Sequence, residues 1–513
     1  MPFHTCLSST PRPWRPEKLL TVFFVTLFSA AVPAQNEVIH IWCGAVTPGS
    51  VKVNAKMTDT SSTIRLTLAT DSLFTSPLYS GIYSSTTATN KMVSMSMGGL
   101  QPSTKYYYAV ESAGVLDSSA EDVGSFTTFA AGPFSFSFVS GSCCVNSQHA
   151  VYEVMKNKSP DFYLCTGDLH YMDPNSTSVS VHRTPYETAV LSMPRAAELF
   201  RKIPFVYVWD DHDFCGNNSD SASQGKESAW QAYREYVPHY PLPNSAAGPI
   251  YQSFTAGRVH FILTDLRSDR YGGSMMGAAQ KQWFRNECIY ARNNDLIAAW
   301  VCSVPWNGMI LADEWAGFQA ERTELANFFR DSLITNLFFL SGDAHMLAYD
   351  DGSHADFASP ISNPAVYPIF HSGALCQNGS VKGGTFSGGV FPNPGILLGQ
   401  FGLFTVTDTG GPDICIRFEG LRADTLANDT LITTFSFCRM LAGPTTVPEQ
   451  GDRGGPSLVK PNPSAGIFLL SAPLAPQRIS VLDPLGKKVE VKVPDSGSLD
   501  LSFLGPGIYF LQV

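Results

Sequence analysis

Four acidic or ionisable residues stand in a row directly after the apolar run 205–209, namely Asp210, Asp211, His212 and Asp213. Carboxylates this close repel one another, and a partly buried carboxylate without a partner either takes up a proton or costs stability. A bound cation would relieve the repulsion. A solvated turn is the alternative, because Asp and Asn are common in loops that follow strands.

Other apolar stretches end in the same kind of residue. Five of six short apolar stretches between 132 and 345 are followed by groups that can bind metals or anions. The groups are Cys143 and Cys144; Asp168, His170, Tyr171 and Asp173; Asp210, Asp211, His212, Asp213, Asn217 and Asn218; Asp265, Arg267 and Arg270; Asp343 and His345. Chance placement in turns would scatter such residues, so the pattern predicts one shared site.

Two of these aspartates directly follow a glycine, at Gly167-Asp168 and Gly342-Asp343. Glycine lets the backbone turn sharply, so each carboxylate could lean between two cations. A pair of cations ~3.5–4 Å apart activates a water and stabilises the attacking and leaving oxygens, which suits hydrolysis of phosphate esters.

Three of these residues are predicted to act in catalysis, namely His212, Arg267 and His345. The histidines could be metal ligands or donors to phosphate oxygens, and an arginine can bind phosphate through two parallel hydrogen bonds. Taken singly, each residue could equally be an ordinary loop residue. Their joint occurrence at strand ends carries the prediction.

The segments that position these groups follow the pattern of an α/β core, which is predicted over residues 132–441. Short β-rich runs alternate with helix-like stretches, and in such folds ligands gather at the carboxyl ends of the strands. A Pro/Gly-rich linker at 442–456 ends this domain. The expected core is a β-sandwich flanked by helices.

Residues 36–130 precede the core and are predicted to be all β. Apolar and polar residues alternate there between Gly, Pro, Ser and Thr turns, as in a small sandwich. The stretch LQPSTKYYYAV at 100–110 resembles the turn and strand of fibronectin-III-like modules. A generic antiparallel domain is the alternative.

Charge and the first residues bear on partners and location. The 513-residue chain has a net charge of −10 and no basic block, which argues against nucleic acid as a partner. Residues 1–34 combine basic residues, an apolar run shorter than the ~20 residues of a membrane span, and a small-residue cleavage position, as in a signal peptide. We expect a monomer without a transmembrane segment, in which most of the cysteines are paired.

The last residues, 457–513, resemble the C-terminal sorting domain of type IX secretion cargo. The resemblance rests on PNP at 461–463, DPLGKKV at 483–489 and the final PGIYFLQV at 506–513. The segment is expected to fold as a small β-sandwich, and a plain β-sandwich module that binds carbohydrate is the alternative. The resemblance implies a partner, the type IX secretion machinery, and export through the periplasm and outer membrane to the cell surface or medium.

The site motifs resemble those of the PhoD-like alkaline phosphatases and phosphodiesterases, in the calcineurin-like metallophosphatase superfamily. The resemblance covers roughly 36–440 and rests on motifs in the family's order: GSC at 141–143, GDLHY at 167–171, WDDHD at 209–213 followed by Asn217, YVPHYPLP at 236–243, LTDLRSDR at 263–270 and SGDAH at 341–345. It implies a metallophosphatase core behind an N-terminal β-sandwich.

The resemblance also implies the cofactors, Fe3+ and Ca2+. A cysteine and a tyrosine bind ferric iron in this family, and these positions match Cys143 and Tyr171. The remaining matched metal positions are Asp168, Asp210, Asp211, Asn217, Asp343 and His345. Thiolate, phenolate and carboxylate suit a trivalent iron, whereas carboxylate and amide oxygens suit calcium. Either Cys143 or Cys144 could supply the sulfur, and either could instead form a disulfide.

The chain departs from the family pattern at two places. GDLHYMD replaces the usual GDYIYE, so His170 and Asp173 are expected to alter the surroundings of the site, and Pro238-His239 replaces a proline-arginine pair. Substrate preference therefore stays open.

The resulting hypothesis is a secreted metal-dependent phosphatase that hydrolyses monoesters, diesters or both through a metal-activated water. Two alternatives are a phosphodiesterase specific for phospholipids or other diesters, and a non-catalytic surface adhesin on a decayed phosphatase scaffold.

Overall fold

A computed structural model describes residues 37–119, 121–243, 247–309, 312–360 and 367–441, and short strands between 459 and 512. The chain divides into two compact units, Met1–Leu441 and Ala442–Val513. The signal peptide predicted at 1–34 and the linker predicted at 442–456 lie outside the described residues.

The first nine strands form two antiparallel layers. They are β1 Val38–Gly44, β2 Ser50–Met57, β3 Ser61–Ala69, β4 Leu78–Tyr79, β5 Tyr83–Ser85, β6 Met92–Gly98, β7 Lys105–Ser112, β8 Val115–Asp117 and β9 Gly124–Thr127. One layer has the order β1-β2-β6 and the other β4-β3-β7-β8, with β5 on β3 and β9 on β7. Alternate residues of these strands, such as Val53, Leu66 and Met95, are fully buried, as the alternating pattern predicts.

A nine-stranded sheet carries the first half of the predicted site. Its remaining strands are β10 Phe136–Gly141, β11 Phe162–Cys165, β12 Phe205–Tyr207, β20 Gly399–Asp408, β21 Asp413–Ala423 and β22 Asp429–Met440. The order is β22-β21-β20-β10-β11-β12-β1-β2-β6, in which β10, β11 and β12 are parallel. Strand β1 pairs with β12 at Gly44 and Phe205, so the N-terminal layer continues this sheet.

A seven-stranded sheet carries the second half of the predicted site. Its order is β13-β14-β15-β16-β18-β17-β19. The strands are β13 Gln252–Ala256, β14 Val259–Leu263, β15 Ile297–Cys302, β16 Leu337–Ser341, β17 Met346–Asp350, β18 Ile369–Ser372 and β19 Gly388–Pro392. Strands β14, β15, β16 and β18 run parallel, which brings their carboxyl ends to one edge.

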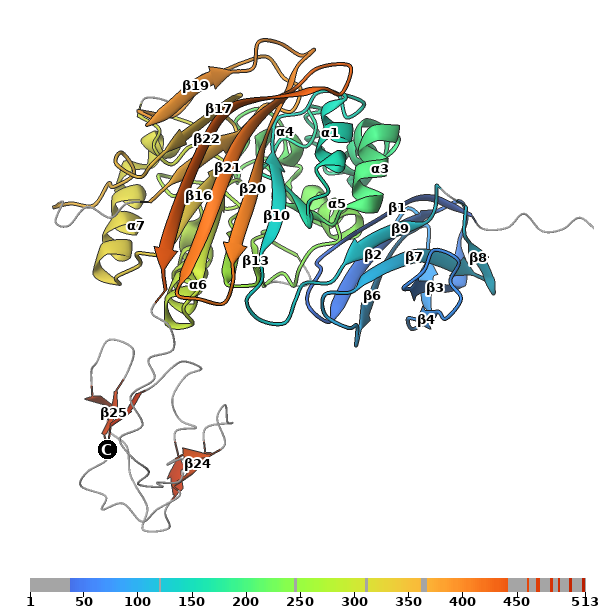
Figure 1. The fold of residues 1–513 in the computed structure, drawn as a ribbon, viewed down its shortest axis with the longest axis horizontal. Coiled ribbons are helices and arrows are strands. Elements are labelled where there is room, and N and C mark those ends of the chain that lie inside the picture. The colour runs from blue at the N-terminus through green and yellow to red at the C-terminus, as the bar shows by residue number, and fades with distance from the viewer. Residues whose placement is uncertain are drawn as a thin grey trace, which may run out of the picture. The chain divides into compact units, whose positions relative to one another are not determined.

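Helices flank the two large sheets (Figure 1). They are α1 Val151–Asn157, α2 Val179–Pro185, the π-helix η1 Tyr186–Leu191, α3 Pro194–Lys202, α4 Asp211–Phe214, α5 Lys226–Tyr236, α6 Gly277–Asn293, the 3-10 helix η2 Trp315–Phe318 and α7 Gln319–Asp331. Phe284 of α6 and Phe329 of α7 pack on Trp300 of β15. No described helix has the length and apolar content needed to cross a bilayer.

An aromatic core joins the two large sheets. Phe138 of β10 stacks on Phe162 and Phe404 of its own sheet, with ring centroids 5.0 and 4.7 Å apart. It meets Phe261 of β14, in the other sheet, edge-on at 5.4 Å. The predicted sandwich flanked by helices is therefore present, and the layers are held by aromatic packing.

The cysteines differ from expectation. One disulfide, Cys415–Cys438, links β21 to β22, while the other eight described cysteines are buried and have free thiols. The expectation that most cysteines pair is wrong for this structure, because most of these eight side chains lie apart from one another in the core as small apolar groups.

In the second unit the described residues are six short strands: β23 Val459–Lys460, β24 Ile467–Leu470, β25 Ser480–Leu482, β26 Lys488–Val489, β27 Ser498–Asp500 and β28 Phe510–Gln512. They form two three-stranded sheets with the orders β23-β24-β27 and β26-β25-β28.

Candidate metal centre

The ends of strands from both large sheets bring two groups of ligand atoms together. The ligand atoms of Cys143, Asp168 and His345 lie within 4.8 Å of one another, and the same spacing holds for Asp168, Asp211 and His212. Asp168 belongs to both groups. Two cation positions that share one carboxylate would fit this arrangement.

Asp168 is buried at the centre of the site. Its Oδ2 accepts a hydrogen bond from the Tyr171 hydroxyl at 2.9 Å and lies 3.5 Å from the Cys143 sulfur. Its Oδ1 has no hydrogen-bond partner among the described residues. Burial raises the pKa of Asp168 well above its ordinary value, and the nearby carboxylates, with Asp211 foremost, raise it further. Only a positive charge lets this group ionise cheaply.

Three of the predicted ligands have a left-handed backbone. The φ angles of Cys143, Asp168 and Asp343 are 62°, 53° and 60°. Residues other than glycine enter this region at a cost of order 1–3 kcal/mol each, and such strain gathers where a side chain must be aimed at a site. All three turns follow directly on the ends of β10, β11 and β16.

Gly167 and Gly342 lie so close to neighbouring strand ends that a side chain would not fit at either position. A Cβ on Gly167 would lie 2.6 Å from the Cβ of Asp210, and a Cβ on Gly342 would lie 2.3 Å from the carbonyl oxygen of Thr166. Gly167 therefore lets the ends of β11 and β12 approach within one sheet, and Gly342 lets the end of β16 approach the end of β11 in the other sheet.

Asp210 is completely buried. Its Oδ1 accepts hydrogen bonds from Arg267 Nε at 2.6 Å and from the Ser303 hydroxyl at 3.0 Å, while Oδ2 has no partner among the described residues. Burial outweighs the opposing effect of Arg267, so the pKa of Asp210 is raised to about 7. One carboxylate oxygen is thus left for a cation.

Arg267 has a different place from the one predicted. Its side chain is completely buried, and its two terminal nitrogens donate to the carboxylate of Asp313 at 2.9 and 3.0 Å. The bidentate partner is therefore Asp313, where a phosphate was expected, and Nε holds Asp210. We reassign Arg267 as a positioning residue, because an arginine enclosed by carboxylates has no open edge for substrate.

Asp211 and His212 begin the short helix α4. Asp211 Oδ2 accepts the backbone N–H of Asn218 at 2.6 Å, whereas Asn217 is exposed at the surface. His212 Nδ1 lies 2.6 Å from Asp173 Oδ1, and its ring lies 4.0 Å from that of Tyr171. Asp173 therefore orients His212.

His170, the other departure from the family motif, does not line the site. It is buried, and its ring packs edge-on against Tyr186 at 6.0 Å.

His345 is fixed in one tautomer. Its Nδ1 lies 2.7 Å from the carbonyl oxygen of Asn378, which can only accept, so Nδ1 carries the proton. Nε2 is then unprotonated and lies 3.1 Å from the Tyr171 hydroxyl. Burial lowers the pKa of His345 to about 4. A neutral imidazole held in this way is the form that binds metals.

The two adjacent cysteines point to different partners. Cys143 lies beside Asp168, and burial followed by the charge of Asp168 raises the pKa of its thiol well above the ordinary value. The Cys144 sulfur instead lies 2.9 Å from the sulfur of Cys376. Cys143 is therefore the sulfur of the cluster.

Lys382 is a site residue that the motifs missed. Its ammonium donates a short hydrogen bond to Asp343 Oδ1, while Asp343 Oδ2 has no partner among the described residues. Burial opposes the charge on Lys382, but Asp343 and Asp210 outweigh it and raise the pKa of this lysine. The available signal was a single lysine in the glycine-rich stretch at 380–384.

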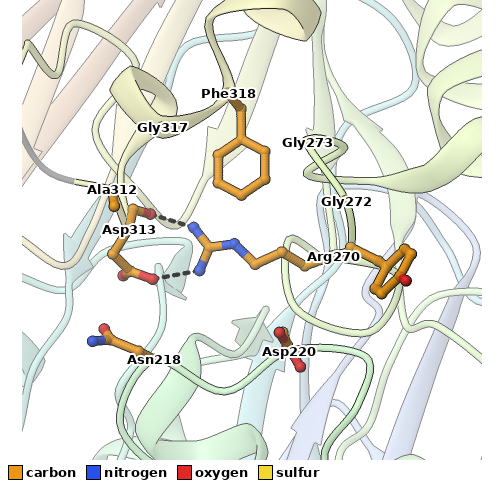
Figure 2. Close-up of a pocket in the computed structure, with 10 residues that line it drawn as sticks. Asn218, Asp220, Arg270, Gly272, Gly273, Ala312, Asp313, Gly317 and Phe318 are labelled. Carbon is orange, nitrogen blue, oxygen red and sulfur yellow. Dashed lines mark hydrogen bonds and ion pairs between the residues drawn. The ribbon is translucent and has the colours of Figure 1, made fainter.

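A pocket of about 360 Å³ opens at the edge of the cluster (Figure 2). It is lined by Asn218, Asp220, Arg270, Tyr271, Gly272, Gly273, Ala312, Asp313, Gly317 and Phe318. Figure 2 shows the Arg270 guanidinium beneath the Phe318 ring and bonded to Asp313. Asn218 and Asp313 border both the pocket and the cluster, because they contact Asp211 and Arg267.

Comparison with known proteins finds similarity in both parts of the chain. Residues 136–385 match the family model of the PhoD-like phosphatases, and residues 459–513 match that of the secretion system C-terminal sorting domain. Alkaline phosphatase D of Bacillus subtilis is 24% identical over 323 residues, which cover 52% of this chain and 54% of the relative. The match thus spans about half the length of this curated relative.

Two solved structures share the fold. The structure of PhoD gives a TM-score of 0.63 at 17% identity and covers 78% of this chain and 90% of that one. The purple acid phosphatase PPD1 from yellow lupin gives 0.55 at 8% identity, with 78% and 74% covered. The fold is therefore that of the PhoD and purple acid phosphatase structures.

Protein stripped of metal by a chelator should lose stability as pH rises. The folded-state pKa values of Asp168 and Asp210 are raised, that of Asp210 to about 7. A raised pKa stabilises the fold most below the unfolded-state value of about 3.9, and this contribution is lost as pH rises through about 7. Urea unfolding should show a decrease on the order of 2–4 kcal/mol between pH 5 and pH 8.

Stripped Asp168→Asn protein is the matched control, and its stability should depend less on pH. Equal urea midpoints at pH 5 and pH 8 in the stripped parent protein would contradict the proposed repulsion.

Proposed function

We propose that this chain, whose residues 136–385 are a PhoD-like phosphatase domain and whose residues 459–513 are a secretion sorting domain, is an exported metal-dependent phosphoesterase. The observation that carries the proposal is the pair of ligand groups that share Asp168. The buried carboxylate oxygens without partners on Asp168, Asp210 and Asp343 support it, because they need positive charge.

The donor atoms fit the cofactors that the family resemblance implies. Cys143, Tyr171 and His345 surround one side of Asp168, and sulfur, phenol, imidazole and carboxylate donors suit Fe3+. The carboxylates of Asp210, Asp211 and Asp343 supply oxygens of the kind that Ca2+ prefers, whereas Asn217, predicted as a ligand, is exposed at the surface. Such cations supply a Lewis acid for phosphoryl oxygens and lower the pKa of a bound water.

The protein's own residues orient and charge the site. Asp173 orients His212 through Nδ1, so Nε2 of the neutral ring is an acceptor that suits a metal, and it donates to a phosphoryl oxygen only when both ring nitrogens carry a proton. Asn378 fixes His345. Arg267 spans Asp210 and Asp313 and keeps the carboxylates in place without touching substrate.

Lys382 is a half-buried cation at the edge of the cluster that could meet a substrate phosphate. It reaches Asp343 from the 380–384 loop, and this loop is anchored by a hydrogen bond from the Gly383 N–H to Glu314 at 2.8 Å. Once Asp343 shares its charge with a metal, the ammonium is free to contact a phosphoryl oxygen.

A diester substrate has room for its second substituent. The pocket beside Asn218 and Asp313 offers aromatic surface from Tyr271 and Phe318, and its volume of about 360 Å³ falls within the usual range for ligand pockets. This supports cleavage of diesters alongside monoesters, with phospholipid headgroups as one possible class.

Asp168→Asn should abolish both metal binding and hydrolysis while the fold is kept. The shared carboxylate is lost, so activity on p-nitrophenyl phosphate and its bis ester should fall by about two orders of magnitude or more. Elemental analysis and circular dichroism check metal content and fold. Asp331→Asn, at an exposed surface pair, is the control and should behave as the parent protein.

Normal metal content in active Asp168→Asn protein would show that this residue only shapes a turn. A parent protein that is folded, free of metal and inactive but binds glycans would instead support the adhesin alternative.

Lys382→Met should lower kcat/KM by roughly 100-fold and leave metal content unchanged. The reason is the loss of one donor to the phosphoryl oxygens, and Lys382→Arg should recover part of the rate because it keeps the charge. Lys281→Met, at a surface ion pair with Glu324, is the matched control. A kcat/KM within twofold of the parent value would remove Lys382 from the substrate site.

Tyr271→Ala should raise the KM for the diester more than the KM for the monoester. Tyr271 is 75% exposed on the pocket wall, and one aromatic contact with a second aryl group is worth roughly three- to tenfold in KM. Steady-state kinetics on p-nitrophenyl phosphate and its bis ester measure the ratio, with Tyr290→Ala as an exposed tyrosine control. Equal changes for both esters would place the second substituent elsewhere.

A further inference from the structure

Cys144 and Cys376 lie side by side although 232 positions separate them in the chain. Their sulfur atoms are 2.9 Å apart, and both side chains are buried, with exposed fractions of 1% and 0%. Closing this gap to the ~2.05 Å of a disulfide requires a movement of roughly 0.9 Å.

The backbone already holds the two residues in a suitable register. Cys144 and Cys376 form an isolated parallel β-bridge. The bridge is flanked by hydrogen bonds from Leu375 N–H to the Ser142 carbonyl at 2.8 Å and from Cys376 N–H to the Cys143 carbonyl at 3.4 Å. Paired strands lie about 4.8 Å apart, which falls within the Cα separation of about 4.4–6.8 Å that disulfides require.

Other buried thiols of the core make different contacts. Cys165 lies against the carbonyl of Gly167, and Cys302 lies against the carbonyl of Val304 and the indole N–H of Trp315. These thiols behave as small core groups, whereas Cys144 and Cys376 face each other.

We propose that Cys144 and Cys376 form a disulfide in the exported protein and that Cys143 keeps its sulfur for metal. The two thiols lose two electrons and two protons as the S–S bond forms. A protein disulfide or a small-molecule disulfide in the oxidising compartment accepts them and becomes two thiols. The sorting domain at 459–513 points to passage through such a compartment.

The crosslink would join the two segments that hold the sulfur and imidazole of the cluster. Cys144 adjoins Cys143 on the segment after β10, and Cys376 lies two residues before Asn378, whose carbonyl fixes His345. This consequence rests on the proposed function. It means that the disulfide keeps two metal-binding side chains at a fixed separation before any metal arrives.

Disulfide mapping of the full-length exported protein, purified without reductant, tests the crosslink directly. Free thiols are alkylated under denaturing conditions, and the digest is analysed by mass spectrometry without reduction. The expected result is a peptide pair joined through Cys144 and Cys376, with Cys143 alkylated. Alkylation of both Cys144 and Cys376, or a crosslink at Cys143, would overturn the proposal.

Thermal unfolding provides a second readout that does not depend on activity. Dithiothreitol should lower the melting midpoint of the parent protein by several degrees, because a crosslink between distant residues restricts the unfolded chain. Cys376→Ser should start at a lower midpoint and show only the smaller response that comes from reduction of Cys415–Cys438, whereas Cys288→Ser, at a buried free thiol, should keep the full parent response. Equal responses of the two variants would contradict the crosslink.

Metal retention separates the two proposals. Reduction, or Cys376→Ser, should speed the loss of metal to a chelator roughly tenfold. Unchanged retention in a mapped, crosslinked protein would refute the role of the disulfide at the metal centre. A crosslinked protein that binds metal and hydrolyses no phosphate ester would refute the proposed function and leave the crosslink standing.

Discussion

The structure depends on one electrostatic constraint: several carboxylates are buried in a small volume with too little positive charge around them. Asp168, Asp210 and Asp343 each keep one carboxylate oxygen without a partner among the described residues. Arg267 and Lys382 neutralise part of this charge from two sides. The proposed cations would balance the charge that remains, and the sulfur of Cys143 and the phenol of Tyr171 beside Asp168 suit a ferric ion.

The fold delivers these charges because two parallel sets of strands end at the same edge. Aromatic packing around Phe138 holds the two sheets face to face. Gly167 and Gly342 then let the strand ends touch, at positions where a Cβ would collide with the neighbouring strand end. Left-handed turns at Cys143, Asp168 and Asp343 aim their side chains into the gap. Packing energy in the core thus offsets local strain and repulsion at the site.

Part of this site follows from the sequence by a simple rule. Residues such as Asp168, Asp211 and Asp343 come directly after strands, and the carboxyl ends of parallel strands converge, so their grouping could be predicted. The role of Arg267 could not be predicted from the sequence, because its partner Asp313 lies in a later loop and no strand or motif indicates where that loop lies. Lys382 was missed for the same reason. The position of a loop depends on contacts across the whole fold.

In the larger architecture, too, local features could be predicted from the sequence and contacts between distant segments could not. Alternating patterns predicted the N-terminal strands, but the pairing of β1 with β12 depends on backbone hydrogen bonds between distant segments and has no local signature. Cysteine pairing in the core likewise depends on burial and geometry, and compartment alone led to the wrong expectation.

X-ray diffraction from crystals of the native protein, with data on both sides of the iron absorption edge, tests the central claim most directly. Anomalous difference maps should show an iron peak between the Cys143 sulfur and Asp168, and a second cation on the opposite side of the same carboxylate. A well-ordered site in which neither peak appears would contradict the account.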